Sequence, residues 1–133
     1  MFGHWISKRS RPPEILAVSR NMALLVRLQE VFGDDVSLRC VSDVEEALTV
    51  LANRPVFGAV IDGALPGHAA RILARAFLRH QPVGRVAIVT AVDDPSTLIG
   101  LAHCDTRVEL LYHPLDEAAL VGCVLSEPVA VGA

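Results

Sequence analysis

Short apolar runs alternate with segments of helical spacing along most of the chain. Five runs consist almost entirely of hydrophobic residues, which is typical of strands that a sheet buries on both faces. Between the runs, hydrophobic residues recur every three or four positions, as they do in amphipathic helices. These patterns predict strands at 14–18, 36–41, 56–61, 85–90 and 108–112.

Polar residues predict where the intervening helices begin and end. Asn21 is a good N-cap residue, and Gly33 favours the end of the helix that follows it. Ser42 and Glu45 have the spacing of a capping box, so a second helix is expected to begin there. Further N-cap residues are predicted at Asp94, which precedes Pro95, and at Asp116. The inner face of the third helix is predicted to consist of Ala69, Ile72, Leu73, Ala76 and Phe77.

Five strands that alternate with five helices predict an α/β fold. Because parallel strands are joined by right-handed crossovers, the expected architecture is a doubly wound, five-stranded parallel sheet. We expect the domain to cover residues 14–126, with a basic tail at 1–13 and a second tail at 127–133. The basic tail has two interpretations, a disordered leader or an arm that binds an acidic partner or a membrane surface.

The composition limits the classes of protein that fit. The 133 residues are 52% hydrophobic but only 5% aromatic, so the core is expected to be aliphatic. No apolar stretch reaches the roughly 18 residues of a membrane span, and the net charge of -3 argues against a nucleic-acid partner. The cysteines are odd in number and far apart, which argues against a disulfide frame or a zinc site and indicates a cytoplasmic protein. They are Cys40, Cys104 and Cys123.

The third apolar run stops at a carboxylate, Asp62, which is followed by the turn residues Gly63, Pro66 and Gly67. In an open α/β sheet, binding sites lie at the carboxyl ends of the strands, so Asp62 is a candidate site residue. A second interpretation is that Asp62 only turns or caps the chain. The ends of the other strands are expected at the same edge, and they are Ser19-Arg20, Thr90-Ala91 and His113-Pro114.

In order and spacing, Asp62, Thr90-Ala91 and Pro114, with the turn Leu65-Pro66-Gly67, resemble the receiver domain of bacterial response regulators. The resemblance covers nearly the whole chain. It implies a flavodoxin-like fold and a role in two-component signal transduction or a phosphorelay. It also implies that Asp62 is the phospho-acceptor position, that Thr90 is the switch position, and that a histidine kinase or a regulatory target is the partner.

Several positions depart from the receiver pattern. Ser19 and Arg20 stand where receivers carry the acidic pair that holds Mg²⁺, and Arg20 has the opposite charge. His113 replaces the receiver lysine, with the following peptide bond expected to be cis as in the family, and Leu110 replaces the switch aromatic residue. We therefore expect a degenerate, pseudo-receiver site without a metal or other cofactor, in which Arg20 forms an ion pair with Asp62.

Three functions remain open. The first is a stand-alone receiver-like signalling domain that acts by protein–protein interaction, as an adaptor or a homodimer; it is not an enzyme, since no nucleophile–base pair is visible. The second is a receiver that is phosphorylated on Asp62 with Mg²⁺. The third is a small-anion binding module at the start of the first helix. Receivers commonly bind partners through the fourth helix, fifth strand and fifth helix, where the interface candidates are Leu98, Leu101, Val121 and Val124.

Overall fold

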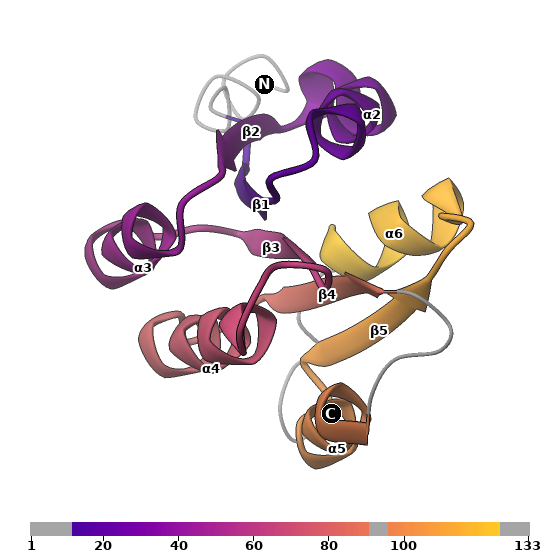
Figure 1. The fold of residues 1–133 in the computed structure, drawn as a ribbon. Coiled ribbons are helices and arrows are strands. Elements are labelled where there is room, and N and C mark those ends of the chain that lie inside the picture. Colours follow the sequence, from indigo (N-terminus) through magenta and orange to yellow (C-terminus); the bar gives the residue numbers. More distant parts are fainter. Residues whose placement is uncertain (1–11, 91–95, 126–133) are drawn as a thin grey trace, which may run out of the picture.

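The computed structural model describes residues 12–90 and 96–125, which form one parallel sheet with helices on both faces (Figure 1). The strands lie in the order β2-β1-β3-β4-β5. They are β1 (Glu14–Val18), β2 (Ser37–Val41), β3 (Gly58–Asp62), β4 (Arg85–Thr90) and β5 (Val108–Tyr112). The helices are α2 (Met22–Phe32), α3 (Val44–Asn53), α4 (Ala69–His80), α5 (Ser96–Cys104) and α6 (Glu117–Val124), with a short 3-10 helix η1 (Gly33–Asp35). The predicted doubly wound α/β fold is confirmed.

The strand order reverses at β1, which pairs with β2 on one side and with β3 on the other. The register places Val18 beside Ile61, so the residues that follow these two strands emerge next to each other. In doubly wound sheets the crevice at such a reversal is where ligands bind. The fold therefore places the end of β1 and the end of β3 together at the expected site.

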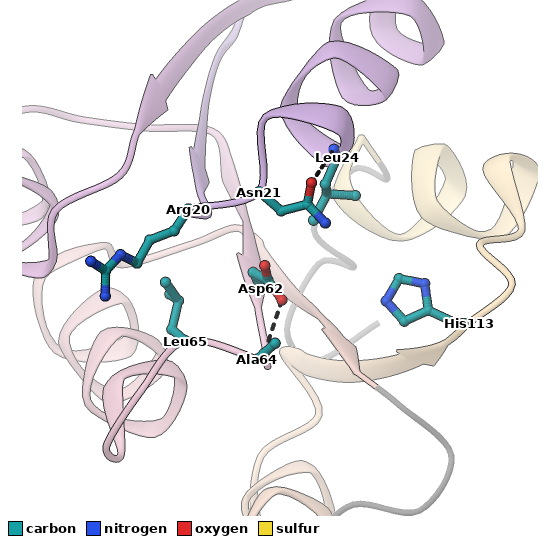
Figure 2. Close-up of a pocket in the computed structure, with 7 residues that line it drawn as sticks. All are labelled: Arg20, Asn21, Leu24, Asp62, Ala64, Leu65 and His113. Atoms are coloured by element: carbon teal, nitrogen blue, oxygen red, sulfur yellow. Dashed lines mark hydrogen bonds between the residues drawn. The ribbon is translucent and has the colours of Figure 1, made fainter.

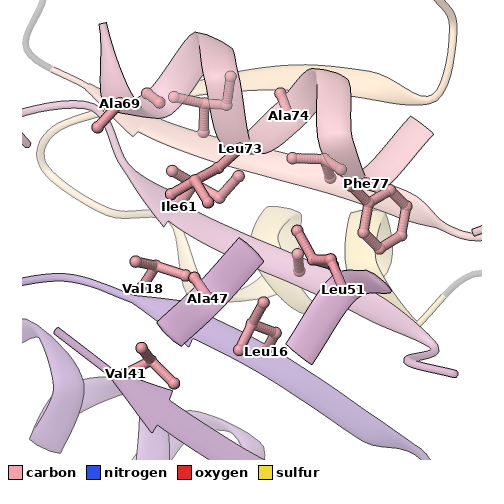
Figure 3. Packing of buried hydrophobic residues seen from close by; sticks show 14 of the residues in the cluster. Leu16, Val18, Val41, Ala47, Leu51, Ile61, Ala69, Leu73, Ala74 and Phe77 are labelled. Atoms are coloured by element: carbon pink, nitrogen blue, oxygen red, sulfur yellow. The ribbon is translucent and has the colours of Figure 1, made fainter. Parts of the chain in front are cut away.

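Hydrophobic residues on the two faces of the sheet form two core layers. On one face Leu16 and Ile61 cluster with residues of α3 and α4, including the fully buried Phe77 (Figure 3). On the other face Ala17 and Val60 cluster with residues of α2 and α6. Successive strand residues point to opposite faces, which is why unbroken apolar runs satisfy both layers. Each fully buried aliphatic side chain contributes roughly 1.5–3 kcal/mol.

The helix ends confirm most of the predicted caps. Asn21 Oδ1 accepts hydrogen bonds from the backbone N–H groups of Ala23 and Leu24, at 3.0 and 3.4 Å. Asp116 Oδ1 accepts from Ala119 N at 3.1 Å. Gly33 ends α2 with a φ of 58°, which favours glycine. The predicted cap at Asp94-Pro95 lies outside the described residues.

Two local predictions were wrong. The N-cap of α3 is Asp43, whose carboxylate accepts from Glu46 N at 3.1 Å, and not Ser42. Both residue types cap well, and the helix begins one residue later than predicted. Ile72, predicted to face inward, is 49% exposed. Leu73 and Phe77 occupy the buried face of α4, and Ile72 lies about 100° around the helix from Leu73.

Side chains also close the edge of the sheet opposite the predicted site. The buried Gln81 donates through Nε2 to the carbonyls of Leu51 and Arg54, and its Oε1 accepts from Val56 N. Arg107 donates to the carbonyl of Gln81 and lies 5.6 Å from the centre of the Phe77 ring. These bonds satisfy backbone groups at the ends of α3 and α4 and in the segment before β3. Within the two described ranges, no helix is both long and apolar enough to cross a membrane.

Candidate functional site at the carboxyl edge of the sheet

Asp62 is the last residue of β3 and is 7% exposed. Ser19 follows β1 directly and is 1% exposed. Its Oγ donates a hydrogen bond to Asp62 Oδ2 at 2.7 Å, a length typical of a hydroxyl that donates to a carboxylate. The two residues are brought together by the pairing of β1 with β3, as their positions at the strand ends predicted.

Both oxygens of the Asp62 carboxylate accept hydrogen bonds from neutral donors. Oδ2 accepts from Ser19, and Oδ1 accepts from the backbone N–H of Ala64 at 2.9 Å. The Ser19 hydroxyl oxygen in turn accepts from Asn21 N at 2.9 Å. A short network therefore connects the turn after β3, the end of β1 and the start of α2.

The expected ion pair between Arg20 and Asp62 is not formed. Arg20 is exposed, and the ion pairs among the described residues do not include it. Figure 2 shows its guanidinium directed away from Asp62. The physical reason is that Ser19 already fills the buried position beside the carboxylate with a short hydroxyl donor, and the adjacent Arg20 is left at the surface.

The remaining predicted site positions lie around the same edge. Thr90 ends β4 and is buried, and its carbonyl accepts from His113 N at 3.1 Å. The peptide bond between His113 and Pro114 is cis, as predicted, and the His113 side chain is exposed. Leu110 is half-buried and packs against the core on the α4 side of the sheet. Ala91, predicted to follow Thr90 at the site, lies outside the described residues.

Gly63 is a site residue that the sequence did not single out as necessary. A Cβ at this position would lie 2.9 Å from the Cβ of Thr90 and 3.0 Å from the carbonyl oxygen of Val89. Its N–H donates to that same carbonyl at 2.7 Å. A glycine directly after the strand-end carboxylate was the available signal, because close backbone approach is a common reason for glycine.

A pocket of about 310 Å³ opens beside the carboxylate (Figure 2). Its lining combines a carboxylate, a guanidinium, an imidazole and an amide with two leucine side chains. The lining residues are Arg20, Asn21, Leu24, Asp62, Ala64, Leu65 and His113. Four of these were not predicted as site residues, because Asn21, Leu24, Ala64 and Leu65 act here through position and shape.

The residues at this edge do not fit Mg²⁺ well. Mg²⁺ requires oxygen ligands and is usually held by carboxylates. Asp62 is the one carboxylate of the pocket lining. Among the described residues, no group of three or more His, Cys, Asp or Glu side chains could hold a metal ion.

An anion meets few free donors at the start of α2. The N–H groups of Ala23 and Leu24 donate to the side chain of Asn21, and Asn21 N donates to Ser19 Oγ. The carboxylate of Asp62 lies at the same site and repels anions. The exposed Arg20 is the one feature of the pocket that favours an anion at any pH.

The four interface candidates differ in how deeply their side chains are buried, where the structure describes them. Leu101 and Val121 are half-buried and pack against the two core layers. Val124 is 1% exposed, so its prediction as a surface residue was wrong. It faces the sheet because it lies over Gly58, where the missing side chain leaves room for it. Leu98 lies in α5, but its side chain is outside the described part of the structure.

Comparisons with known proteins give structural relatives only. No family model matches the chain, and no curated protein matches it. The signal receiver domain of an HD domain-containing protein from Pseudomonas fluorescens is 27% identical, with a TM-score of 0.72 over 85% of this chain and 91% of that one. A response regulator receiver protein from Sinorhizobium medicae is 19% identical, with a TM-score of 0.69 over 85% of this chain and 91% of that one.

A structure named as an adenylate cyclase, from Rhodopirellula baltica, is also similar, at 19% identity and a TM-score of 0.71 over 82% of each chain. An identity this low shows that the fold is shared, and it carries no argument about the activity. The remaining neighbours include further receiver domains with TM-scores between 0.63 and 0.69. With its five parallel strands in one sheet and its five α-helices, the described part of the chain has the flavodoxin-like fold of the response regulator receiver domains of two-component systems.

Proposed function

We propose that this receiver-like domain signals by protein–protein interaction and is not phosphorylated through Mg²⁺. The carrying observation is the hydrogen bond from Ser19 Oγ to Asp62 Oδ2. It places a neutral hydroxyl at the position where receivers use an acidic residue. The acceptor aspartate is retained, but it is held by neutral donors and lacks a second carboxylate for a metal.

The chemistry of phosphoryl transfer supports this proposal. Catalysis of that reaction consists almost entirely of positioning and of neutralising the charge around the transferred group. At this site the attacking group would be the Asp62 carboxylate, an anion that approaches another anion. Without a metal, the cationic group of the pocket is Arg20, which is directed away from Asp62.

Intact-mass measurement tests the proposal. The protein is incubated with acetyl phosphate and MgCl₂, because receivers need Mg²⁺ for this reaction. We expect an unchanged mass for the wild type and for Asp62→Asn. A stable gain of one phosphoryl group in the wild type that is lost in Asp62→Asn would contradict the proposal.

That contradicting outcome would favour the second function, a receiver phosphorylated on Asp62. Two observations support it: the buried Asp62 at the end of β3, and Thr90 at the end of β4. The third function, a small-anion module, is disfavoured because the N–H groups of Asn21, Ala23 and Leu24 at the start of α2 already donate to side chains of the protein. Added phosphate should therefore leave the melting temperature unchanged.

The partner is proposed to be another signalling protein, a histidine kinase or a regulatory target, or a second copy of this chain. Half-buried Leu101 and Val121 leave the α5 and α6 surface less apolar than the sequence predicted. Among the described large hydrophobic residues of that side, Ile99 of α5 is 38% exposed and Tyr112 of β5 is 39% exposed. Substitution of both by glutamate is the corresponding interface test, with partner binding and self-association as the measured quantities.

A further inference from the structure

We propose that the pocket beside Asp62 receives a basic side chain, lysine or arginine, from the partner protein. This inference rests on the proposed function, because a metal at Asp62 would occupy the place of that cation.

The first reason is the unbalanced charge of Asp62. The residue is 7% exposed, and the hydroxyl of Ser19 and the N–H of Ala64 that bond it are both neutral. The three ion pairs among the described residues all lie elsewhere. A carboxylate oxygen accepts about two hydrogen bonds, so each oxygen of Asp62 can accept one more. Because a buried charge is stabilised by an opposite charge, a cation that enters the pocket gains binding free energy from Asp62.

The second reason is the shape and lining of the pocket. Leu24 and Leu65 provide apolar surface, while Asp62 provides the charged group. Lysine and arginine have the matching form, since an apolar stem of methylene groups carries the charged head. The volume of about 310 Å³ lies at the lower end of the roughly 300–1,000 Å³ of small-molecule pockets. This size suits one side chain better than a folded segment.

Arg20, the protein's own cationic side chain at this edge, does not occupy the position beside Asp62. Arg20 lies on the rim of the pocket, exposed and directed away from the carboxylate (Figure 2). Its positive charge at the rim repels an incoming cation. Replacement of Arg20 by glutamine should therefore tighten the binding of a basic side chain.

Titration of the isotope-labelled protein by nuclear magnetic resonance, in EDTA without Mg²⁺, tests the inference. The probe is N-acetyl-lysine methylamide, and its matched control is N-acetyl-norleucine methylamide, which has the same stem without the ammonium group. We expect saturable shifts of the Ser19 and Ala64 amide signals with the lysine probe and none with the norleucine probe. Asp62→Asn should weaken the affinity for the lysine probe at least tenfold, and Arg20→Gln should strengthen it.

Equal shifts with both probes, or an unchanged affinity in a folded Asp62→Asn, would overturn the inference. If Asp62→Asn does not fold, the comparison of the two probes on the wild type decides alone. The failures of the two proposals are distinguishable. A phosphoryl gain in the mass experiment overturns the proposed function, whereas an unchanged mass without lysine binding overturns only this inference.

Discussion

The hydroxyl of Ser19 joins three elements of the site with two hydrogen bonds. It donates to Asp62 at the end of β3 and accepts from Asn21 N at the start of α2. Because Ser19 is only 1% exposed, water cannot reach the hydroxyl to replace either hydrogen bond. The buried carboxylate of Asp62 therefore depends on this serine for half of its hydrogen bonds within the protein.

Ser19→Ala should lower the free energy of unfolding by about 1–3 kcal/mol, the usual effect of leaving a buried polar group without its partner. Urea denaturation followed by circular dichroism measures this change. The control is Ser42→Ala at an exposed position, which should stay within about 0.5 kcal/mol of the wild type. Equal effects of the two substitutions would show that the Ser19 hydrogen bond does not stabilise the fold.

Cys123 on α6 is a second residue whose surroundings determine its chemistry. Burial, and then the negative charge and hydrogen bond of Glu109, raise the pKa of its thiol to about 12. The folded state therefore holds the thiol proton more tightly than the unfolded state does. The contribution of this group to stability is complete below the ordinary thiol pKa of 9.0 and declines as the pH rises towards 12.

Because the thiolate is the reactive form, Cys123 should resist alkylation by iodoacetamide at pH 8 in the folded protein. Mass spectrometry of a Cys104→Ser background measures the labelling. One label, on the exposed Cys40, is expected under native conditions and two in urea. Rapid native labelling of Cys123 would contradict the buried position of α6.

At this scale the sequence predicted which residues share the site but not how they pair. The strand ends locate Asp62, Thr90 and His113, since parallel strands end at one edge. The partner of Asp62 was predicted wrongly because charge favoured Arg20 over its neighbour Ser19. Burial decided between the two, and the burial of one strand-end side chain rather than the next depends on local geometry that the sequence pattern does not resolve.

Helix α6 packs on the sheet through a glycine of β3. A Cβ at Gly58 would lie 2.8 Å from Cγ1 of Val124 and 3.1 Å from its carbonyl oxygen. The absence of a side chain at Gly58 thus lets the backbone of α6 approach the strand. Gly122, in the same helix, is exposed and would have nothing within 4 Å of an added Cβ.

The two glycines should respond oppositely to alanine. Gly122→Ala should raise the free energy of unfolding by about 0.5–1 kcal/mol, since glycine costs that amount in a helix interior. Gly58→Ala should lower it by about 1–3 kcal/mol through overpacking against Val124. Urea denaturation of both variants measures the changes, and each variant is the control for the other. Stabilisation by Gly58→Ala would contradict the close approach of α6.

Elements were predictable to different degrees. The strands were predicted nearly to the residue because their apolar runs are continuous, with β3 displaced towards Asp62. The faces of the helices were less certain, because several nearby positions are apolar. Val124 and Ile72 show this uncertainty, since each is hydrophobic and only the packing distinguishes the buried one from the exposed one.

The whole molecule was the most predictable level. Alternation of strands and helices, together with the handedness of crossovers, leaves few sheet topologies. The receiver resemblance then implied a flavodoxin-like fold, which the structure confirms. The whole-chain pattern did not provide the chemistry of the site, because that chemistry depends on single residues at the strand ends, such as Ser19, Arg20 and His113.

Global stability can test whether that framework still accepts a metal. The double substitution Ser19→Asp and Arg20→Asp places new carboxylates beside Asp62, and their repulsion should destabilise the protein in EDTA. Mg²⁺ should restore stability, by about 1.4 kcal/mol when its concentration is tenfold above Kd. Differential scanning calorimetry measures both effects. The wild type is the control, and an equal gain in its melting temperature with Mg²⁺ would contradict the degenerate-site interpretation.

β1 lies inside the sheet, between β2 and β3, and this position matters when the chain is synthesised on the ribosome. β1 is buried on both faces and pairs with β3. Ser19, which follows β1, and its partner Asp62, at the end of β3, are 43 residues apart in the chain. At about 5–20 residues per second, a nascent β1 waits roughly 2–9 s for β3 to be translated. During that interval its apolar faces are available to chaperones or to neighbouring chains. The carboxylate of Asp62 can therefore acquire its hydroxyl partner only after that interval.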